Sequence, residues 1–161
     1  MAYARNTKKV KVEPLLFDTY LAVIRGSVDS KMFREFYAKV NGSKRETLQS
    51  GRLSCAFYIS FILKSFSLMK ELQITIHRTL DDMEKSGWKE VAKPRIGALV
   101  LWDEIPAPSD AKSKINAPIH KHMGFFIGKN LAISNRSHTQ TPLAHPLRYQ
   151  TLQTELKKGK V

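Results

Sequence analysis

The hydrophobic period of this 161-residue chain changes between Pro94 and Gly97, and this change limits the folds open to it. Before that point apolar residues recur at helical spacing, whereas after it they gather in short runs of strand length. Three such runs are "ALVLW" at 98–102, "HMGFFIG" at 122–128 and "LAISN" at 131–135, and "TPLAHPLRY" at 141–149 offers one more. Lys129-Asn130 predicts a tight hairpin between the second and third runs. Helices followed by a small, largely antiparallel sheet predict an α+β fold.

Four helices are expected in the first half of the chain. They cover "PLLFDTYLAVIRG" at 14–26, "SVDSKMFREFYAKVNG" at 27–42, residues 55–68 and "TIHRTLDDMEKSGW" at 75–88. In the second of these, Asn41-Gly42 is interpreted as a helix stop. The expected organisation is a basic flexible arm at 1–13, one domain at 14–152 that is helical over 14–90 and forms a sheet over 96–150, and a basic tail at 153–161.

Composition narrows the biochemical setting. The single cysteine excludes an internal disulfide and a Cys-x-x-Cys zinc site, and no cofactor or metal is expected. The net charge of +13 favours attraction to anionic polymers. No signal-peptide pattern is seen, and the longest apolar run is too short to span a bilayer. We therefore expect no membrane span, and a protein that is cytoplasmic or is released by a non-standard route.

The single cysteine, Cys55, is the main candidate for chemistry. It stands where the polar run "SGRLS" meets the apolar run "AFYISFIL", at the expected start of a helix, with Ser54 as the N-cap. Unpaired N–H groups and the helix dipole at that end would lower the thiol pKa and stabilise a thiolate. The alternative is a small, buried and inert side chain.

A cysteine nucleophile needs a base, and histidine is the usual one. Of the five histidines, His120 and His122 share one face of the strand that runs through 122–128. His122 lies nearer the apolar run and is therefore better held, while His120 is expected to line a groove. Trp102 could line the same groove, although packing in the core is the more common role of a tryptophan.

The runs "SCAFYISFIL", "GWKEVAKPRIGALVLW" and "HKHMGFFIGKNLAISN" together resemble the NlpC/P60 and CHAP-type cell-wall cysteine peptidases and amidases. The resemblance covers residues 54–135, about half of the chain. It implies a papain-like fold with helices packed against a small antiparallel sheet, and a thiol hydrolase with Cys55 as nucleophile and His122 as its base. It also implies peptides of bacterial peptidoglycan as substrate.

The third catalytic position departs from the family pattern. The second histidine of the NlpC/P60 group falls at Ser134, and Asn135 follows it. Papain-like enzymes often use asparagine here, so Asn135 is preferred and Ser134 is the alternative. Gln49, six positions before Cys55, is similar to the papain-type glutamine that donates to the oxyanion, or it is an ordinary loop residue.

The sequence therefore predicts a cysteine hydrolase that cleaves an amide bond, with peptidoglycan stem peptides as the substrate. Two alternatives remain open. One is a papain-like binding module whose catalytic site has decayed, for which Ser134 in place of a histidine is the supporting feature. The other is a basic protein associated with nucleic acid, which would bind with steep salt dependence.

Overall fold

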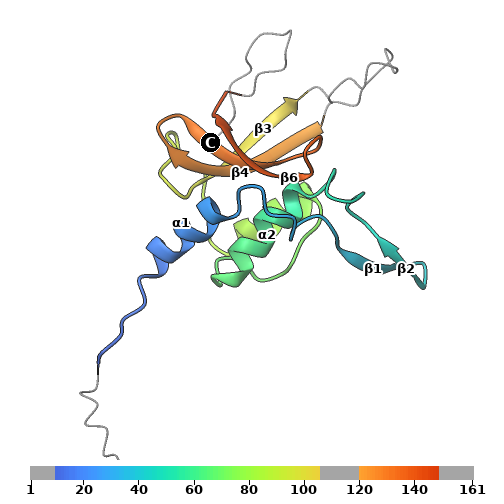
Figure 1. Ribbon diagram of the computed structural model, residues 1–161, viewed down its shortest axis with the longest axis horizontal. Helices are drawn as coiled ribbons and strands as arrows, with labels where there is room; N and C mark the ends of the chain where they lie inside the picture. Colours follow the sequence, from blue (N-terminus) through green and yellow to red (C-terminus); the bar gives the residue numbers. More distant parts are fainter. Residues whose placement is uncertain (1–9, 106–119, 149–161) are drawn as a thin grey trace, which may run out of the picture.

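The computed structural model describes residues 10–105 and 120–148, with the backbone alone at 103–105 and at 120 (Figure 1). Within these ranges the chain forms three helices and two antiparallel sheets, which confirms the α+β prediction. The helices are α1 (Leu16–Gly26), α2 (Cys55–Ser65) and α3 (Ile76–Lys85). The larger sheet has the order β3-β4-β5-β6, and the smaller one pairs β1 with β2. None of the described helices is long and apolar enough to cross a membrane.

The larger sheet follows the predicted strand runs. It contains β3 (Leu99–Ile105), β4 (His120–Gly128), β5 (Leu131–Arg136) and β6 (Thr141–Pro146). Lys129 and Asn130 form the predicted tight turn and both have positive φ. The start of the predicted N-terminal arm, residues 1–9, and the predicted basic tail at 153–161 lie outside the described residues.

The predicted helix over residues 27–42 is wrong, and so is the prediction that 14–90 is helical throughout. Strands β1 (Tyr37–Val40) and β2 (Ser43–Glu46) form a hairpin there, with Val40 paired to Ser43. Asn41 and Gly42 between them have φ of 50° and 80°, which suits the type I′ turn of a two-residue hairpin. The Asn-Gly pair therefore reverses the direction of a strand and does not terminate a helix.

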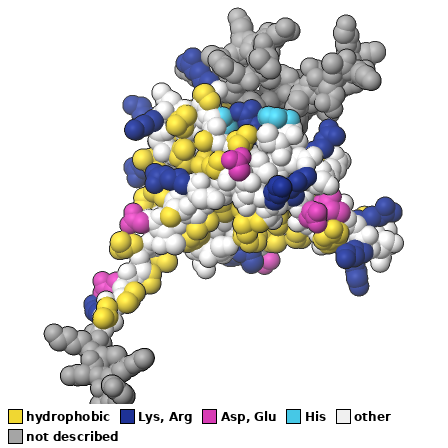
Figure 2. Space-filling view, viewed as in Figure 1, with side chains coloured by type: hydrophobic (Ala, Val, Ile, Leu, Met, Phe, Trp, Pro, Cys, Tyr) yellow, Lys and Arg dark blue, Asp and Glu magenta, His cyan; other side chains and the backbone are white. Residues whose placement is uncertain are grey.

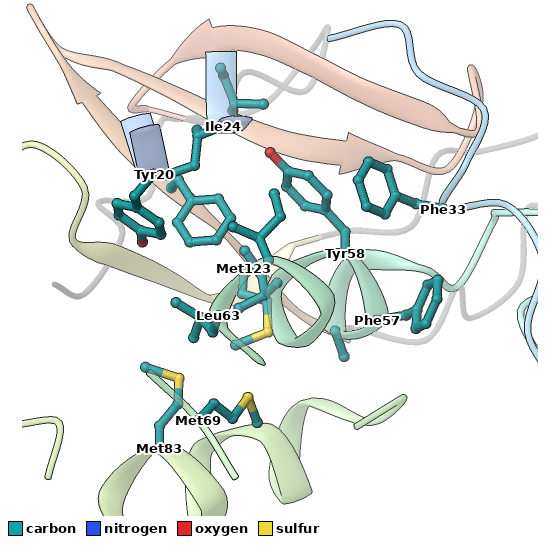
Figure 3. Close-up of a cluster of buried hydrophobic side chains, with 14 of the residues drawn as sticks. Tyr20, Ile24, Phe33, Phe57, Tyr58, Leu63, Met69, Met83 and Met123 are labelled. Atoms are coloured by element: carbon teal, nitrogen blue, oxygen red, sulfur yellow. The ribbon is translucent and has the colours of Figure 1, made fainter. Parts of the chain in front are cut away.

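Helix α2 is the centre of the core (Figure 3). Most of its side chains are buried, on every side of the helix, and a helix that is apolar all round must be covered all round. It packs against β4 and β5 of the sheet and against α1 and α3. Tyr58 is fully buried, with its ring edge-on to Phe33 at 4.9 Å and to Phe125 at 5.5 Å between centroids. Its hydroxyl is hydrogen-bonded to Ser27 Oγ at 2.8 Å.

The two faces of the larger sheet carry different side chains, because residues alternate along each strand. On the α2 side, Met123 and Phe125 of β4 belong to the main hydrophobic core. Trp102 and Ala132 belong to a second, smaller cluster. Since Trp102 is directly opposite His122 in the β3–β4 pairing, we place His122 on the face of this second cluster.

Gly124 should be the most sensitive glycine of the sheet. A Cβ there would meet Ile133 O at 2.7 Å, Ser134 Cβ at 2.8 Å and Trp102 Cζ3 at 3.0 Å. We expect Gly124→Ala to lower the free energy of unfolding by about 1–3 kcal/mol, measured by urea denaturation, because packed atoms must shift to admit the methyl group. Gly26→Ala is the matched control, since a Cβ there meets no atom within 4 Å, and it should be neutral or stabilising. Equal effects of the two substitutions would contradict this packing.

Candidate active site

The start of α2 lies beneath the larger sheet and carries Cys55. Ser54 occupies the N-cap position, as the sequence predicts, yet its side chain makes no capping hydrogen bond to the helix. The Ser54 hydroxyl donates instead to Gly51 O at 3.1 Å in the preceding turn. This bond ties the turn to the helix start, and it leaves the first N–H groups of α2 without a side-chain cap.

The Cys55 thiol is inserted between the start of α2 and strand β4. It packs against the main core, and the backbone N–H groups of Ala56, Met123 and Cys55 itself lie close enough to the sulfur to favour its thiolate form. The Met123 contact is the informative one, because it comes from the strand that carries the predicted base. The thiol therefore lies beside β4 at the residue that follows His122.

Burial decides the charge of this thiol. Although Cys55 keeps some exposed surface, burial raises the pKa of its thiol from 9.0 to about 11. The three N–H groups act in the opposite direction but do not overcome the loss of hydration. The sequence predicted a lowered thiol pKa from the helix end alone, and the structure gives the opposite direction. At neutral pH the resting cysteine is a neutral thiol.

His122 is buried, and its ring lies against the Trp102 indole with 5.7 Å between the ring centroids. His122 precedes Met123 in β4, and the Met123 amide lies beside the Cys55 thiol. Cys55 and His122 are therefore close neighbours on opposite sides of β4. The thiol lies at the Met123 amide, and the His122 ring lies against Trp102. A productive pair requires the His122 ring to face the thiol.

Asn135 belongs to the same end of the sheet. The side chain is 1% exposed, and its Nδ2 donates to Gly51 O at 2.8 Å, the carbonyl that also accepts from Ser54. Its Oδ1 is buried and accepts no hydrogen bond from any described residue. Pairing between β4 and β5 stops at Ile133, and Asn135 is held in the sheet by its pairing with Pro142 of β6. Asn135 therefore links the turn before Cys55 to the strand next to His122, and it presents an acceptor.

Ser134 lies on the face of the sheet that carries Trp102 and Ala132, and its hydroxyl has a partner there. Its hydroxyl is hydrogen-bonded to His145 Nε2 at 2.7 Å. His145 Nδ1 donates to Pro146 O at 2.8 Å, so Nε2 is the acceptor for the Ser134 hydroxyl. Burial, assisted by the nearby charge of Arg136, lowers the pKa of His145 to about 4 and keeps the ring neutral.

His145 was not among the residues that the sequence singled out. Its ring lies 5.4 Å from that of Trp102, so Trp102 has a histidine on two sides. The signal for it was available in the pairing of "LAISN" with "TPLAHP", which sets His145 opposite Ala132 and diagonal to Ser134. Reading that signal requires the register of the β5–β6 hairpin, which depends on strand pairing and not on local sequence.

The remaining predicted residues lie as follows. Trp102 is 2% exposed and donates from Nε1 to Leu147 O at 2.8 Å, which places it in the core and not on a groove wall. Gln49 is exposed in a turn with φ of 51°, and no described hydrogen bond joins its side chain to Cys55. His120 begins β4, but its side chain lies outside the described part of the chain. Among the described residues, no group of three His, Cys, Asp or Glu side chains could hold a metal ion.

The sequence was also compared with known proteins. No protein-family model matches it, and no curated protein matches it.

The raised pKa can be measured directly, because Cys55 is the only cysteine in the chain. We expect the rate of alkylation by iodoacetamide to rise with pH around a midpoint near 11 in the folded protein. The thiolate is the reactive form, so the rate follows the deprotonated fraction. In urea the midpoint should return to the value of an ordinary cysteine. A native midpoint at or below 9.0 would contradict the burial described here.

Proposed function

We propose that this protein is a papain-like cysteine hydrolase that cleaves an amide bond, with Cys55 as the nucleophile and His122 as its base. One observation carries the proposal: the Cys55 thiol, at the first residue of α2, lies beside the backbone amide of Met123, the residue that follows His122. A helix-end cysteine beside a strand that carries a histidine is the arrangement that thiol hydrolases use.

The neutral thiol fixes the order of proton transfers. Because burial keeps Cys55 protonated, the His122 imidazole takes the thiol proton as sulfur attacks the substrate carbonyl. The resulting imidazolium gives that proton to the leaving amine, and a thioester on Cys55 remains. Water then hydrolyses the thioester, with His122 again as the base. The N–H groups at the start of α2, with the Gln49 amide as a second donor, would stabilise the oxyanion.

Asn135 supplies the orienting acceptor in this proposal. Its Oδ1 is buried and accepts no hydrogen bond from described residues, while its Nδ2 is anchored on Gly51 O. A buried amide carbonyl without a donor costs free energy, and a histidine N–H would satisfy it. To form such a bond the His122 ring would have to turn from Trp102 toward the α2 side of the sheet, where the bond would hold it in one tautomer near the thiol. Ser134 is less suited to this role, because its hydroxyl already bonds His145.

The resemblance to NlpC/P60 and CHAP-type enzymes directs the proposal to stem peptides of bacterial peptidoglycan. The net charge of +13 supports a negatively charged surface as the place of action.

A second candidate function is a binding module of the same fold that holds such peptides without cleaving them. Two observations favour it. The thiol pKa is raised and not lowered, and the His122 ring packs on Trp102. The two candidates differ in one measurable outcome, which is whether a bound stem peptide is cleaved.

Hydrolysis of soluble stem peptides, followed by mass spectrometry, tests the two candidates. We expect cleavage by the wild-type protein and complete loss in both Cys55→Ala and His122→Ala, because the two groups act as a unit. Asn135→Ala should reduce turnover by about tenfold to a hundredfold, since orientation assists proton transfer without replacing it. Ser134→Ala should reduce turnover less than Asn135→Ala does.

The control is His138→Ala, which removes an exposed histidine and should leave turnover unchanged. Each variant needs an unfolding curve, because His122 and Asn135 are buried and their loss could weaken the fold. Cleavage that survives in Cys55→Ala would place the nucleophile elsewhere. Binding without cleavage by the wild-type protein would establish the second candidate.

A further inference from the structure

The turn that leads into α2 has an unusual backbone. Gln49, Ser50 and Gly51 are three consecutive residues with positive φ, of 51°, 54° and 98°. Glycine adopts this conformation easily, whereas glutamine and serine adopt it only at a cost in conformational energy. A backbone of this kind persists where surrounding contacts hold it, and such backbones gather at functional sites. The contacts that hold this turn therefore bear on the candidate site that begins at Cys55.

Glu46, the last residue of β2, holds the turn by its N–H groups. Its Oε1 accepts hydrogen bonds from Leu48 N–H at 2.7 Å and Phe36 N–H at 3.4 Å, and its Oε2 accepts from Ser50 N–H at 3.1 Å. Desolvation alone would raise the pKa of this carboxyl, but the hydrogen bonds from the backbone lower it, so the group is ionised at neutral pH. Hydrogen bonds to an ionised carboxylate are about twice as strong as neutral ones. Figure 2 shows acidic side chains at the base of the β1–β2 hairpin, where it joins the body of the molecule.

Arg34 holds the same turn by a carbonyl group. Its Nε donates to Ser50 O at 3.2 Å, and its guanidinium also donates to Gln140 Oε1 in the turn between β5 and β6. Gly51 packs closely against that second turn, because a Cβ at Gly51 would lie 2.9 Å from Gln140 O. The turn before α2 is thus fixed from one side by the β1–β2 hairpin and from the other by the larger sheet.

The fixed turn presents the carbonyl oxygen of Gly51 to the candidate site. Asn135 Nδ2 donates to this oxygen at 2.8 Å, and Ser54 Oγ donates to it at 3.1 Å. The Asn135 side chain is buried, and this hydrogen bond anchors its amide group. A shift of Gly51 O would let the amide rotate, and the rotation would move Oδ1 together with Nδ2. The position of the Asn135 acceptor therefore depends on the position of the turn.

We propose that Glu46 is a positioning residue of this site, which acts through Gly51 O on the side chain of Asn135. Its effect on turnover rests on the proposed function, in which Asn135 orients His122. Its effect on Asn135 does not, because that effect follows from the hydrogen bonds that join Glu46 to the turn and the turn to Asn135. The inference also gives the β1–β2 hairpin a use, since the hairpin supplies the carboxylate that holds the turn.

Hydrogen exchange of the Asn135 side-chain amide, measured by NMR, tests the link directly. The signal is assigned by its absence in Asn135→Ala. We expect Glu46→Gln to speed this exchange by at least about fivefold, because glutamine offers one acceptor oxygen in place of two and the loosened turn moves Gly51 O away from the amide. The matched control is Glu35→Gln, which makes the same change at an exposed carboxylate that accepts from the Tyr37 hydroxyl. Its exchange rate should equal that of the wild-type protein.

Turnover of stem peptides supplies the second readout. Glu46→Gln should lower kcat by about threefold to tenfold and leave KM nearly unchanged, because it displaces an orienting group without touching the substrate. In the double variant Glu46→Gln/Asn135→Ala, kcat should equal that of Asn135→Ala alone, since Glu46 acts through Asn135. A residue that serves the fold alone would leave the kcat of the folded protein unchanged.

Arg34→Lys serves if Glu46→Gln fails to fold. It keeps the positive charge but removes the Nε donor to Ser50 O, so it loosens the same turn from its carbonyl side. This variant should also speed exchange of the Asn135 amide, and its effect on kcat should also disappear when Asn135 is replaced by alanine. An unfolding curve for each variant identifies the conditions under which it is folded.

Three results would overturn the inference. They are unchanged exchange of the Asn135 amide in a folded Glu46→Gln or Arg34→Lys variant, equally faster exchange in Glu35→Gln, and a further fall in kcat when Glu46→Gln is added to Asn135→Ala. Failure of the hydrolase proposal looks different. In that case the wild-type protein cleaves no stem peptide, while Glu46→Gln still speeds exchange of the Asn135 amide.

Discussion

The burial of α2 against strands β4 and β5 is the contact on which the rest of the structure depends. Nearly every side chain from Ala56 to Leu63 is removed from water, so the sheet, α1 and α3 must each cover part of this helix. The packing of α2 against β4 fixes the position of Cys55, the first residue of the helix. Cys55 is pressed against β4, and its thiol meets the amide of Met123. The candidate site is therefore a consequence of core packing.

The same packing sets the chemistry of the thiol. The N–H groups at the start of α2 favour a thiolate. Burial between α2 and β4 removes the water around the sulfur, and this loss of hydration disfavours the thiolate more than the N–H groups favour it. The balance leaves a neutral thiol with a pKa near 11. In the proposed hydrolase, a neutral thiol needs its base in contact during the attack, because no thiolate–imidazolium pair exists at rest. This makes the orientation of His122, and with it the role of Asn135, the feature that distinguishes a hydrolase from a binding module.

Much of the fold could be predicted from the sequence because the signals were local. The runs after Gly97 had strand length and turn residues at both ends, and "AFYISFIL" had the length and apolar character of a core helix. The hairpin at Tyr37–Glu46 could not be predicted in the same way, because its apolar residues also fit helical spacing and Asn41-Gly42 ends either element. Strand pairing decided between them, and pairing is not a local property.

The site could be predicted only in part, for a related reason. Alternation along β4 gives His122 a face of the sheet, but not the side on which α2 packs, and Met123 proved to be the residue on that side. The Ser134–His145 bond depends on the register between β5 and β6. The pKa of Cys55 depends on how closely the strand covers it, which no residue type reveals.

The central claim, that Cys55 and His122 act as one unit, can be tested without knowing the substrate. The measurement is the rate of Cys55 alkylation by iodoacetamide in the wild-type protein, in His122→Ala and in His77→Ala, at neutral pH and again above pH 11. If His122 takes the thiol proton, its loss should slow alkylation at neutral pH by at least about tenfold and have little effect above the thiol pKa. His77→Ala, which changes an exposed histidine of α3, should match the wild-type protein at both pH values. Identical rates for the wild-type protein and a folded His122→Ala variant at neutral pH would contradict the pairing and leave Cys55 as a buried structural residue.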